Sequence, residues 1–406
     1  MRGKKNNDTI IIFTLYKWGN KYEASIKFLA KELVKEYNVI FINGPYTMKD
    51  FIFNFRKLFK SGKYKKLLPF SSGVEDLYFS NGTKITIINP PILLPTNSIP
   101  EGNIYNFLHK INHLLIASRV KKALKAHRIK DYIFINSFNF LYESLDMYLK
   151  PTLNVYYCVD EQVKPQSLKH GYRQENEIIS RSDLVIVTSE GLLPKKMKMN
   201  PNCKVVNNAA DISHFLRALK PETVIPDFIS KLLTPIIGYY GVIERRFDFI
   251  TIKAVAEKHP EWSFVLIGSV QEKYIPQDFD KIKNIHFIGY QPYEVLPEIL
   301  KGIDVAMIPY KKDEVSNTIY PLKINEYLGA GKPVVATVFN EDLLDKFDDV
   351  VYFAKDDEEF AKGIELGLQN NSEEIVKKRL AVASKNSWSH RAIEFSNVLE
   401  DAIMTH

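Results

Sequence analysis

Cysteine and long apolar runs are almost absent from this chain of 406 residues. Its two cysteines, Cys158 and Cys203, form no Cys-x-x-Cys pair, which argues against a disulfide-built domain and a cysteine-rich zinc site. No run of about 18 apolar residues is present, and such a run is what a membrane-spanning helix needs. We therefore expect a cytoplasmic protein with two buried thiols.

The start of the chain lacks the pattern of a secretory signal. Its first apolar run, IIIFTLY at residues 10–16, is short and continues into Lys17 and Trp18. No small-residue cleavage site follows. This run is typical of a buried strand.

Acidic residues are scarce in the first half only. Residues 1–220 contain 34 Lys+Arg and 18 Asp+Glu, a net charge of +16, whereas residues 221–406 contain 21 and 30, a net charge of −9. This asymmetry indicates that the halves meet different partners. Two interpretations stay open: lysine-rich solvated helices, or a surface for anionic lipid headgroups of the inner membrane face or for an anionic acceptor. No nucleic-acid-binding motif is present, so we expect no nucleic-acid partner.

Short β-branched runs alternate with helix-length amphipathic segments along the whole chain. This alternation predicts an α/β protein with parallel sheets wound on both faces, in two Rossmann-like domains. We expect domains at 1–220 and 221–387, with a C-terminal helix at about 388–406 that packs back on the first. The expected strands are 9–15, 37–42, 84–88, 131–136, 153–159, 184–187 and 204–206, then 235–240, 263–267, 285–288, 305–308, 333–336 and 350–353.

Residues 44–80 do not fit this alternation. Their central stretch, FIFNFRKLFKSGKYKKLLPF, combines aromatic and basic residues and predicts an amphipathic insertion. Such a segment either packs on its own domain as an ordinary helix or lies on a membrane surface.

The stretch SNTIYPLKINEYLGAGKP places a cation and a carboxylate near a helix start. Pro321 suits the first helical turn, whose unpaired backbone N–H groups favour a phosphate. Lys323 adds positive charge, and Glu326 lies one turn further on the same face. This spacing matches a nucleoside diphosphate, with Lys323 at the pyrophosphate and Glu326 at the ribose hydroxyls. An ordinary surface ion pair is the alternative.

A second stretch, PIIGYYGVIERRFDF, ends a strand at Gly241 and continues into a cationic loop. Ligands of open parallel sheets bind beyond the carboxyl ends of the strands. Arg245 and Arg246 are therefore candidates to hold a pyrophosphate. The alternative is that they pair with Glu244 or Asp248.

Together these stretches resemble the nucleotide-sugar domain of GT-B glycosyltransferases, in the retaining family 4. The bacterial branch with teichuronic-acid and other surface-polysaccharide transferases is the most similar. The resemblance extends over about residues 150–400. Its motifs stand at 158–161, 182–190, 241–248, 262–268, 292–297, 304–309, 321–335 and 387–395.

The resemblance implies two Rossmann-like domains facing a central cleft and a transferase of the hexosyl type that uses no metal or cofactor. A UDP-sugar is the favoured donor, and a glycan or lipid-linked acceptor receives the sugar. The family's first motif Glu is replaced here by Thr318, so the sugar contacts move to 316–318. The implied donor residues are Gly241, Arg245, Arg246, Gly289, Tyr290, Ser316, Asn317, Thr318, Pro321, Leu322, Lys323 and Glu326.

The first domain is expected to bind the acceptor. Asp160 and Glu161 follow a predicted strand, and we favour Asp160 as the base, with Arg246 and Lys323 as its catalytic partners at the diphosphate. A turn carboxylate is the alternative for Asp160. Trp18 and Gly19 follow the first strand, where a sugar could stack. Rival functions are a nucleotide-sugar epimerase and a non-catalytic nucleotide-sugar or glycan-binding protein of the same fold.

Overall fold

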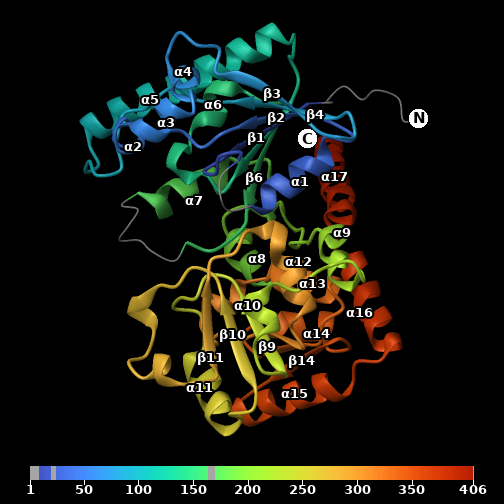
Figure 1. Cartoon of the computed structure of the whole chain (residues 1–406). Helices are drawn as coiled ribbons and strands as arrows, with labels where there is room; N and C mark the ends of the chain where they lie inside the picture. Colours follow the sequence, from blue (N-terminus) through green and yellow to red (C-terminus); the bar gives the residue numbers. More distant parts are fainter. Residues whose placement is uncertain (1–8, 20–23, 163–169, 406) are drawn as a thin grey trace. The chain divides into compact units, whose positions relative to one another are not determined.

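The computed structural model describes residues 9–19, 24–162 and 170–405 and forms two compact units. Unit 1 comprises residues 1–206 and 392–406, and unit 2 comprises residues 207–391. We expected boundaries near 220 and 387; the chain divides at 206/207 and 391/392. Figure 1 shows the helices and strands of each unit.

Unit 1 is built on an eight-stranded sheet in the order β3-β4-β2-β1-β5-β6-β7-β8. Every pairing is parallel except that of β3 with β4. The strands are β1 (Thr9–Thr14), β2 (Asn38–Ile42), β3 (Val74–Tyr78), β4 (Lys84–Ile88), β5 (Ile133–Ser137), β6 (Leu153–Cys158), β7 (Leu184–Val187) and β8 (Cys203–Val205).

Helices cover both faces of this sheet because its central strands are apolar on both sides. Ile11 and Phe13 of β1 pack in one cluster with Ile116 and Val120 of the long helix α5, and Ile10 and Ile12 are buried on the opposite face. The helices are α1 (Ser25–Leu33), α2 (Met48–Phe53), α3 (Phe55–Lys60), α4 (Tyr64–Leu67), α5 (Asn103–Ala126), α6 (Leu145–Leu149), α7 (Gly171–Arg181) and α8 (Leu193–Met197).

Unit 2 contains a fully parallel six-stranded sheet in the order β11-β10-β9-β12-β13-β14. The strands are β9 (Ile236–Tyr240), β10 (Ser263–Ile267), β11 (Ile285–Gly289), β12 (Val305–Ile308), β13 (Val334–Thr337) and β14 (Val351–Ala354). The helices are α9 (Ile212–Phe215), α10 (Asp227–Ser230), α11 (Phe249–Lys258), α12 (Leu296–Lys301), α13 (Leu322–Gly329), α14 (Leu344–Phe347), α15 (Asp357–Gln369) and α16 (Glu373–Lys385).

The last helix, α17 (Trp388–Thr405), starts in unit 2 and continues into unit 1. Within unit 1, the ring of its Phe395 meets Tyr157 of β6 edge to face at a centroid distance of 5.4 Å. This contact ties the end of the chain to the first sheet.

The predicted fold class is confirmed, because both sheets are wound with helices on their faces. All thirteen predicted strands are present within about two residues of their predicted bounds. One strand was not predicted: β3 lies in the basic insertion and runs antiparallel to β4 at the sheet edge. Its sequence, VEDLY, carries two acids and is only partly buried, so it lacks the apolar run of the others.

Two glycines allow the ends of β9 and β10 to touch. Gly241 and Gly268 follow these strands with φ of 146° and 142°. A Cβ atom on Gly268 would lie 1.9 Å from the Gly241 carbonyl oxygen. Only glycine fits such a close backbone approach.

We predict that Gly268→Ala destabilises unit 2 by about 2–4 kcal/mol, because strain at positive φ adds to the backbone clash. Gly82→Ala is the matched control, since Gly82 also has positive φ, 83°, but a Cβ atom on it would have no heavy atom within 4 Å. It is expected to cost only about 1–2 kcal/mol. Denaturant unfolding measures both, and equal losses would contradict the role of the close approach.

Candidate functional site

The strand order of unit 2 reverses at β9. The chain proceeds from β9 to β10 and β11 on one side, and from β12 to β13 and β14 on the other. The loops that leave β9 and β12 therefore diverge at their carboxyl ends, where open α/β sheets bind ligands. Most of the predicted donor residues follow these two strands.

Lys323 lies in the first turn of α13, over the end of β9. Its Nζ donates to the Tyr310 hydroxyl at 3.2 Å and lies 5.6 Å from the centroid of the Tyr239 ring. A Cβ atom on Gly241 would lie 2.5 Å from Lys323 Cε. The lysine side chain thus rests on the Gly241 backbone, which explains the glycine at this position.

Tyr310, directly after β12, connects the two predicted cations. Burial by itself would raise the pKa of its phenol, but the charges of Lys323 and Arg246 bring that pKa below its usual value. Two cations from separate loops therefore act on one hydroxyl. This hydroxyl lies at the point where the strand order reverses.

Arg246 and Arg245 each have an acidic neighbour. Arg246 Nε donates to Glu244 Oε1 at 2.6 Å, as the alternative interpretation expected. Arg245 Nη1 lies 3.6 Å from Asp313 Oδ2, a partner 68 positions away that the sequence did not suggest. Both side chains are partly exposed, so these pairs are accessible to an anionic ligand.

Glu326 lies on the same helix, one turn after Lys323, and is buried. Its Oε2 accepts a hydrogen bond of 2.5 Å from the Tyr240 hydroxyl. Burial raises the pKa of the Glu326 carboxyl, although Tyr240 and the charge of Lys323 oppose this shift. The surface ion pair that we kept as an alternative does not describe this side chain, because its hydrogen-bond partner is a buried tyrosine.

The remaining donor residues either follow β12 or lie at the end of β11. Ser316 and Thr318 belong to a single 3-10 turn, Ser316–Thr318, which Asp313 holds by accepting from the Ser316 N–H at 2.7 Å. Ser316 is fully buried, whereas Asn317 is exposed. Pro321 is the residue immediately before α13, Leu322 is its first residue, and Gly289 and Tyr290 end β11.

In unit 1, the predicted acceptor carboxylates follow β6. Asp160 Oδ1 accepts from the Glu161 N–H at 2.9 Å, the turn contact that we had considered as its alternative role. Burial and then the charge of Asp160 raise the pKa of Tyr16, which places Asp160 near the loop after β1. Glu161 instead pairs with Lys195 and with the buried Lys196.

Trp18 and Gly19 occupy that loop after β1. The Trp18 ring packs edge to face on Phe41 at a centroid distance of 4.9 Å, and its backbone N–H donates to Asn43 Oδ1 at 2.7 Å. Gly19 has φ of 77° and open space around it. The glycine, rather than the indole, is thus the open part of this loop.

A buried polar cluster in unit 1 brings together His109, His113 and Glu143. His113 Nδ1 donates to the His109 carbonyl, and its Nε2 accepts from the Ser144 N–H. Burial lowers the pKa of His113 to about 4, so the ring is neutral at pH 7. Both ring nitrogens of His113 are already hydrogen-bonded within the fold. This arrangement suits a structural network that joins α5 to the segment before α6.

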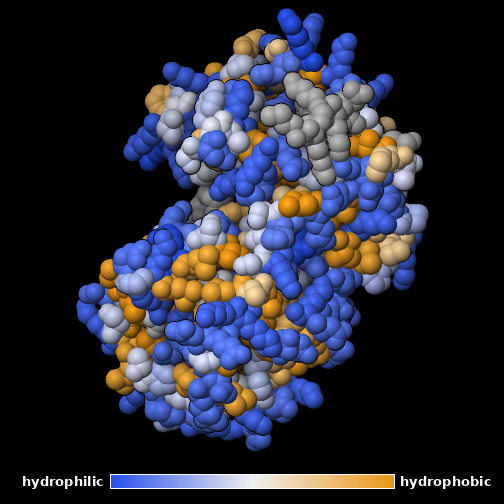
Figure 2. All heavy atoms as spheres, turned by 90° about the vertical axis from the view of Figure 1, so that its right-hand side faces the viewer, coloured by the Kyte–Doolittle hydropathy of each residue, from blue (hydrophilic) through white to orange (hydrophobic). Residues whose placement is uncertain are grey.

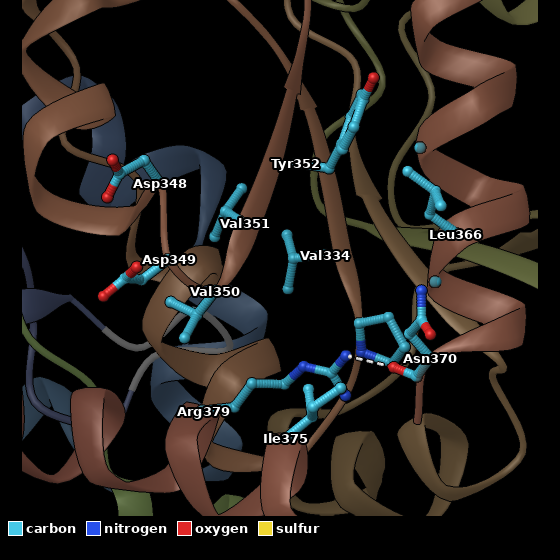
Figure 3. A pocket seen from close by; sticks show the side chains of 13 residues that line it. Val334, Asp348, Asp349, Val350, Val351, Tyr352, Leu366, Asn370, Ile375 and Arg379 are labelled. Atoms are coloured by element: carbon cyan, nitrogen blue, oxygen red, sulfur yellow. Dashed lines mark hydrogen bonds between the residues drawn. The ribbon is translucent and has the colours of Figure 1, made fainter. Parts of the chain in front are cut away.

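A pocket of about 190 Å³ lies at the β14 edge of the second sheet (Figure 3). It is lined by residues at the start of β13 and β14 and by α15 and α16. Arg379 in its wall donates to the carbonyl oxygens of Gly331 and Asn370, which fixes α16 to the fold. None of the predicted donor residues lines this pocket.

Comparison with known proteins agrees with this geometry. Residues 234–370 match the family described as Glycosyl transferases group 1. A stretch of 159 residues is 28% identical to TuaH of Bacillus subtilis (strain 168), which is provisionally named a teichuronic acid biosynthesis glycosyltransferase. That stretch covers 38% of this chain and 40% of TuaH.

Solved structures extend the likeness over nearly the whole chain. Anabaena HepE in complex with UDP has a TM-score of 0.62 at 14% identity and covers 97% of this chain and 100% of its own. Sucrose-phosphate synthase from Thermosynechococcus elongatus has a TM-score of 0.66 at 12% identity, over 98% and 100%. The chain therefore has the GT-B fold that the resemblance implied.

Sequence reasoning missed the tyrosines of this candidate site. Tyr239 and Tyr310 flank Lys323, and Tyr240 holds Glu326. The adjacent pair in IIGYYG, at the end of an apolar strand, was the available signal, because buried phenols need hydrogen-bond partners. We had interpreted these residues only as strand.

Glu326→Gln tests the raised pKa of Glu326. A raised pKa means that the folded protein holds the proton more tightly than the unfolded chain, so its stabilisation is complete below pH 4.5 and is lost as pH rises through the raised value. Gln stays neutral and can still accept from Tyr240. We predict that the unfolding free energy of the wild type falls relative to Glu326→Gln as pH rises from 4.5 to 7.

Chemical denaturation at several pH values measures this difference. Glu257→Gln, on the exposed side of α11, is the matched control and is expected to give a flat difference. A flat difference for Glu326→Gln as well would contradict the burial argument.

Proposed function

We propose that this protein transfers a sugar from a UDP-sugar to a glycan or lipid-linked acceptor in the biosynthesis of a cell-surface polysaccharide. The observation that carries the proposal is the position of Lys323 and Arg246 at the point where the strand order reverses. Lys323 Nζ donates to the Tyr310 hydroxyl at 3.2 Å, and the N–H of Lys311, the next residue, donates to the Arg246 carbonyl oxygen at 2.8 Å. The group 1 match supports glycosyl transfer, TuaH supports the surface-polysaccharide role, and the complexes of HepE with UDP and with UDP-glucose support the donor.

The two cations act on the leaving group. When the glycosidic bond to the diphosphate breaks, negative charge grows on the departing phosphate oxygen and the sugar becomes oxocarbenium-like. Cations fixed beside that oxygen stabilise the transition state more than the ground state. Lys323 is fixed by the Tyr310 hydroxyl and the Gly241 backbone. The protein thus supplies the charge that other enzymes obtain from a metal, and we propose a metal-independent reaction.

Glu326 has the position for the ribose. It follows Lys323 by one helical turn, about 5 Å along the helix axis, which is the step from a diphosphate to the adjoining pentose. The carboxylate would accept hydrogen bonds from the ribose hydroxyls. Tyr240 donates to Oε2 and so fixes the orientation of the carboxyl group.

The donor sugar would lie near the turn Ser316–Thr318. Asn317 is exposed there and can contact the sugar hydroxyls, whereas Ser316 is buried. Asp160 is our proposed base on the acceptor side. Retention of configuration follows from the family 4 resemblance and belongs to the same proposal.

Thr318, in the place of the family's first motif Glu, favours one alternative: a protein that binds nucleotide sugars without transferring them. Incubation with a labelled UDP-sugar and candidate acceptors separates the functions by their products. Transfer gives a labelled acceptor and UDP, an epimerase gives a changed nucleotide sugar, and a binding protein gives neither. Binding without any labelled acceptor or released UDP would contradict the proposal.

Lys323→Met tests the diphosphate contact. We predict that affinity for UDP falls about ten- to a hundredfold, because a hydrogen bond to a charged group contributes about 1.5–3 kcal/mol. Calorimetric titration with UDP, with GDP, ADP and dTDP for comparison, measures the change. Lys253→Met, on α11, is the matched control. Unchanged UDP affinity in Lys323→Met would show that the diphosphate binds elsewhere.

A further inference from the structure

The insertion between β2 and β3 has an exposed apolar surface. Eleven of the thirteen residues 48–60, in α2 and α3, are exposed, and Leu58 alone among them is buried. Phe53 is 78% exposed, and Phe70, after α4, is 97% exposed. We call residues 48–70 the aromatic-basic surface. Its other exposed apolar residues are Met48, Ile52, Phe55, Phe59 and Leu68.

This surface is held firmly by the rest of unit 1. Arg119 of α5 is buried and donates to the carbonyl oxygens of Lys66 and Leu68 at 2.8 and 2.6 Å. Thr47 and Asp50 form a capping box at the start of α2. In Figure 1, α2, α3 and α4 lie together on the outside of the unit, beside α5. The aromatic side chains are therefore presented by an anchored segment.

Its aromatic rings form a continuous row. Phe51, Phe55, Phe59 and Tyr64 follow one another at centroid distances of 5.6, 5.7 and 5.1 Å. Helices of six residues that bury a single side chain gain little from packing. The face in Figure 2 is covered mainly by hydrophilic residues with smaller apolar patches. In the row, Phe55 and Phe59 are exposed, whereas Phe51 and Tyr64 are partly exposed. Such a row differs from the surface in Figure 2 and marks an interaction site.

The charges around the rings identify the partner. Residues 44–72 contain six Lys and one Arg against a single Asp. Protein–protein interfaces are depleted in Lys, whereas interfacial helices place Phe and Leu on one face and Lys on the other. Three of the seven exposed apolar side chains, Met48, Ile52 and Leu68, are aliphatic, which suits an acyl layer better than a platform for stacked bases.

We propose that the aromatic-basic surface docks on an anionic lipid bilayer, with Phe53, Phe70 and Ile52 at the acyl boundary and the lysines at lipid phosphates. The long lysine stems allow their charges to reach the headgroups while the rings lie deeper. This docking needs no nucleotide, so it does not rest on the proposed transfer reaction. It would bring unit 1 to the membrane that carries a lipid-linked acceptor.

The full-length protein and vesicles of phosphatidylcholine with or without phosphatidylglycerol test this docking by co-sedimentation without nucleotide. We expect binding to the anionic vesicles alone, and its loss at about 1 M salt, where the Debye length is about 3 Å. Phe53→Ser with Phe70→Ser is expected to lower affinity at least about tenfold. Leu233→Ser with Ile250→Ser, equally exposed in unit 2, is the matched control and should bind as the wild type.

A second pair of substitutions, Lys57→Glu with Lys60→Glu, tests the contribution of the lysines. It is expected to weaken binding to the anionic vesicles about a hundredfold. Lys377→Glu with Lys378→Glu on α16 is its control. All substituted side chains are exposed or partly exposed, so circular dichroism and thermal unfolding should match the wild type. The proposal is overturned if the wild type does not bind anionic vesicles, or if the control pairs lose as much vesicle affinity as the test pairs. It is also overturned if the aromatic variants keep vesicle binding and lose only self-association or binding to single-stranded nucleic acid.

Discussion

The contact between Lys323 and the backbone of Gly241 is the constraint on which the candidate site depends. It exists because Gly241, directly after β9, has a positive φ. Lys323, the second residue of α13, lies over that strand end. Gly268 brings the neighbouring loop against the same glycine. These approaches hold a cation where two loops diverge, and they do so with backbone atoms that cannot rotate away.

Around this contact, buried tyrosines fix the side chains of Lys323 and Glu326. Tyr310 joins the loop after β12 to Lys323, and Tyr240 joins the end of β9 to Glu326. A flexible lysine loses rotamer entropy when it binds a ligand, so a lysine that is already fixed can bind a diphosphate at a lower cost. Under the proposed function, the tyrosines hold the cation and the carboxyl group in place before a ligand binds.

Much of this could be predicted from the sequence. The strand runs of both units are apolar and β-branched, and their spacing revealed the two sheets. The proposed roles of Lys323 and Glu326 rest on their spacing of one helical turn, which is a local relation. The Arg245–Asp313 pair could not be predicted, because it joins loops that follow different strands. The Tyr310–Lys323 bond could not be predicted either, because it depends on how the irregular segment between β12 and α13 folds back. The antiparallel β3 was missed because its two acidic residues interrupt the apolar pattern of a strand. The anchoring of α4 by Arg119 was missed because it joins residues about 50 positions apart.

The most direct measurement is a crystal structure of this protein with UDP bound. The account predicts the diphosphate over Gly241, with Lys323 and Arg246 in contact with its oxygens and with the ribose hydroxyls at Glu326. The account is contradicted if clear density for UDP lies elsewhere on unit 2. In that case Lys323 would still be bonded to Tyr310, with no phosphate near it.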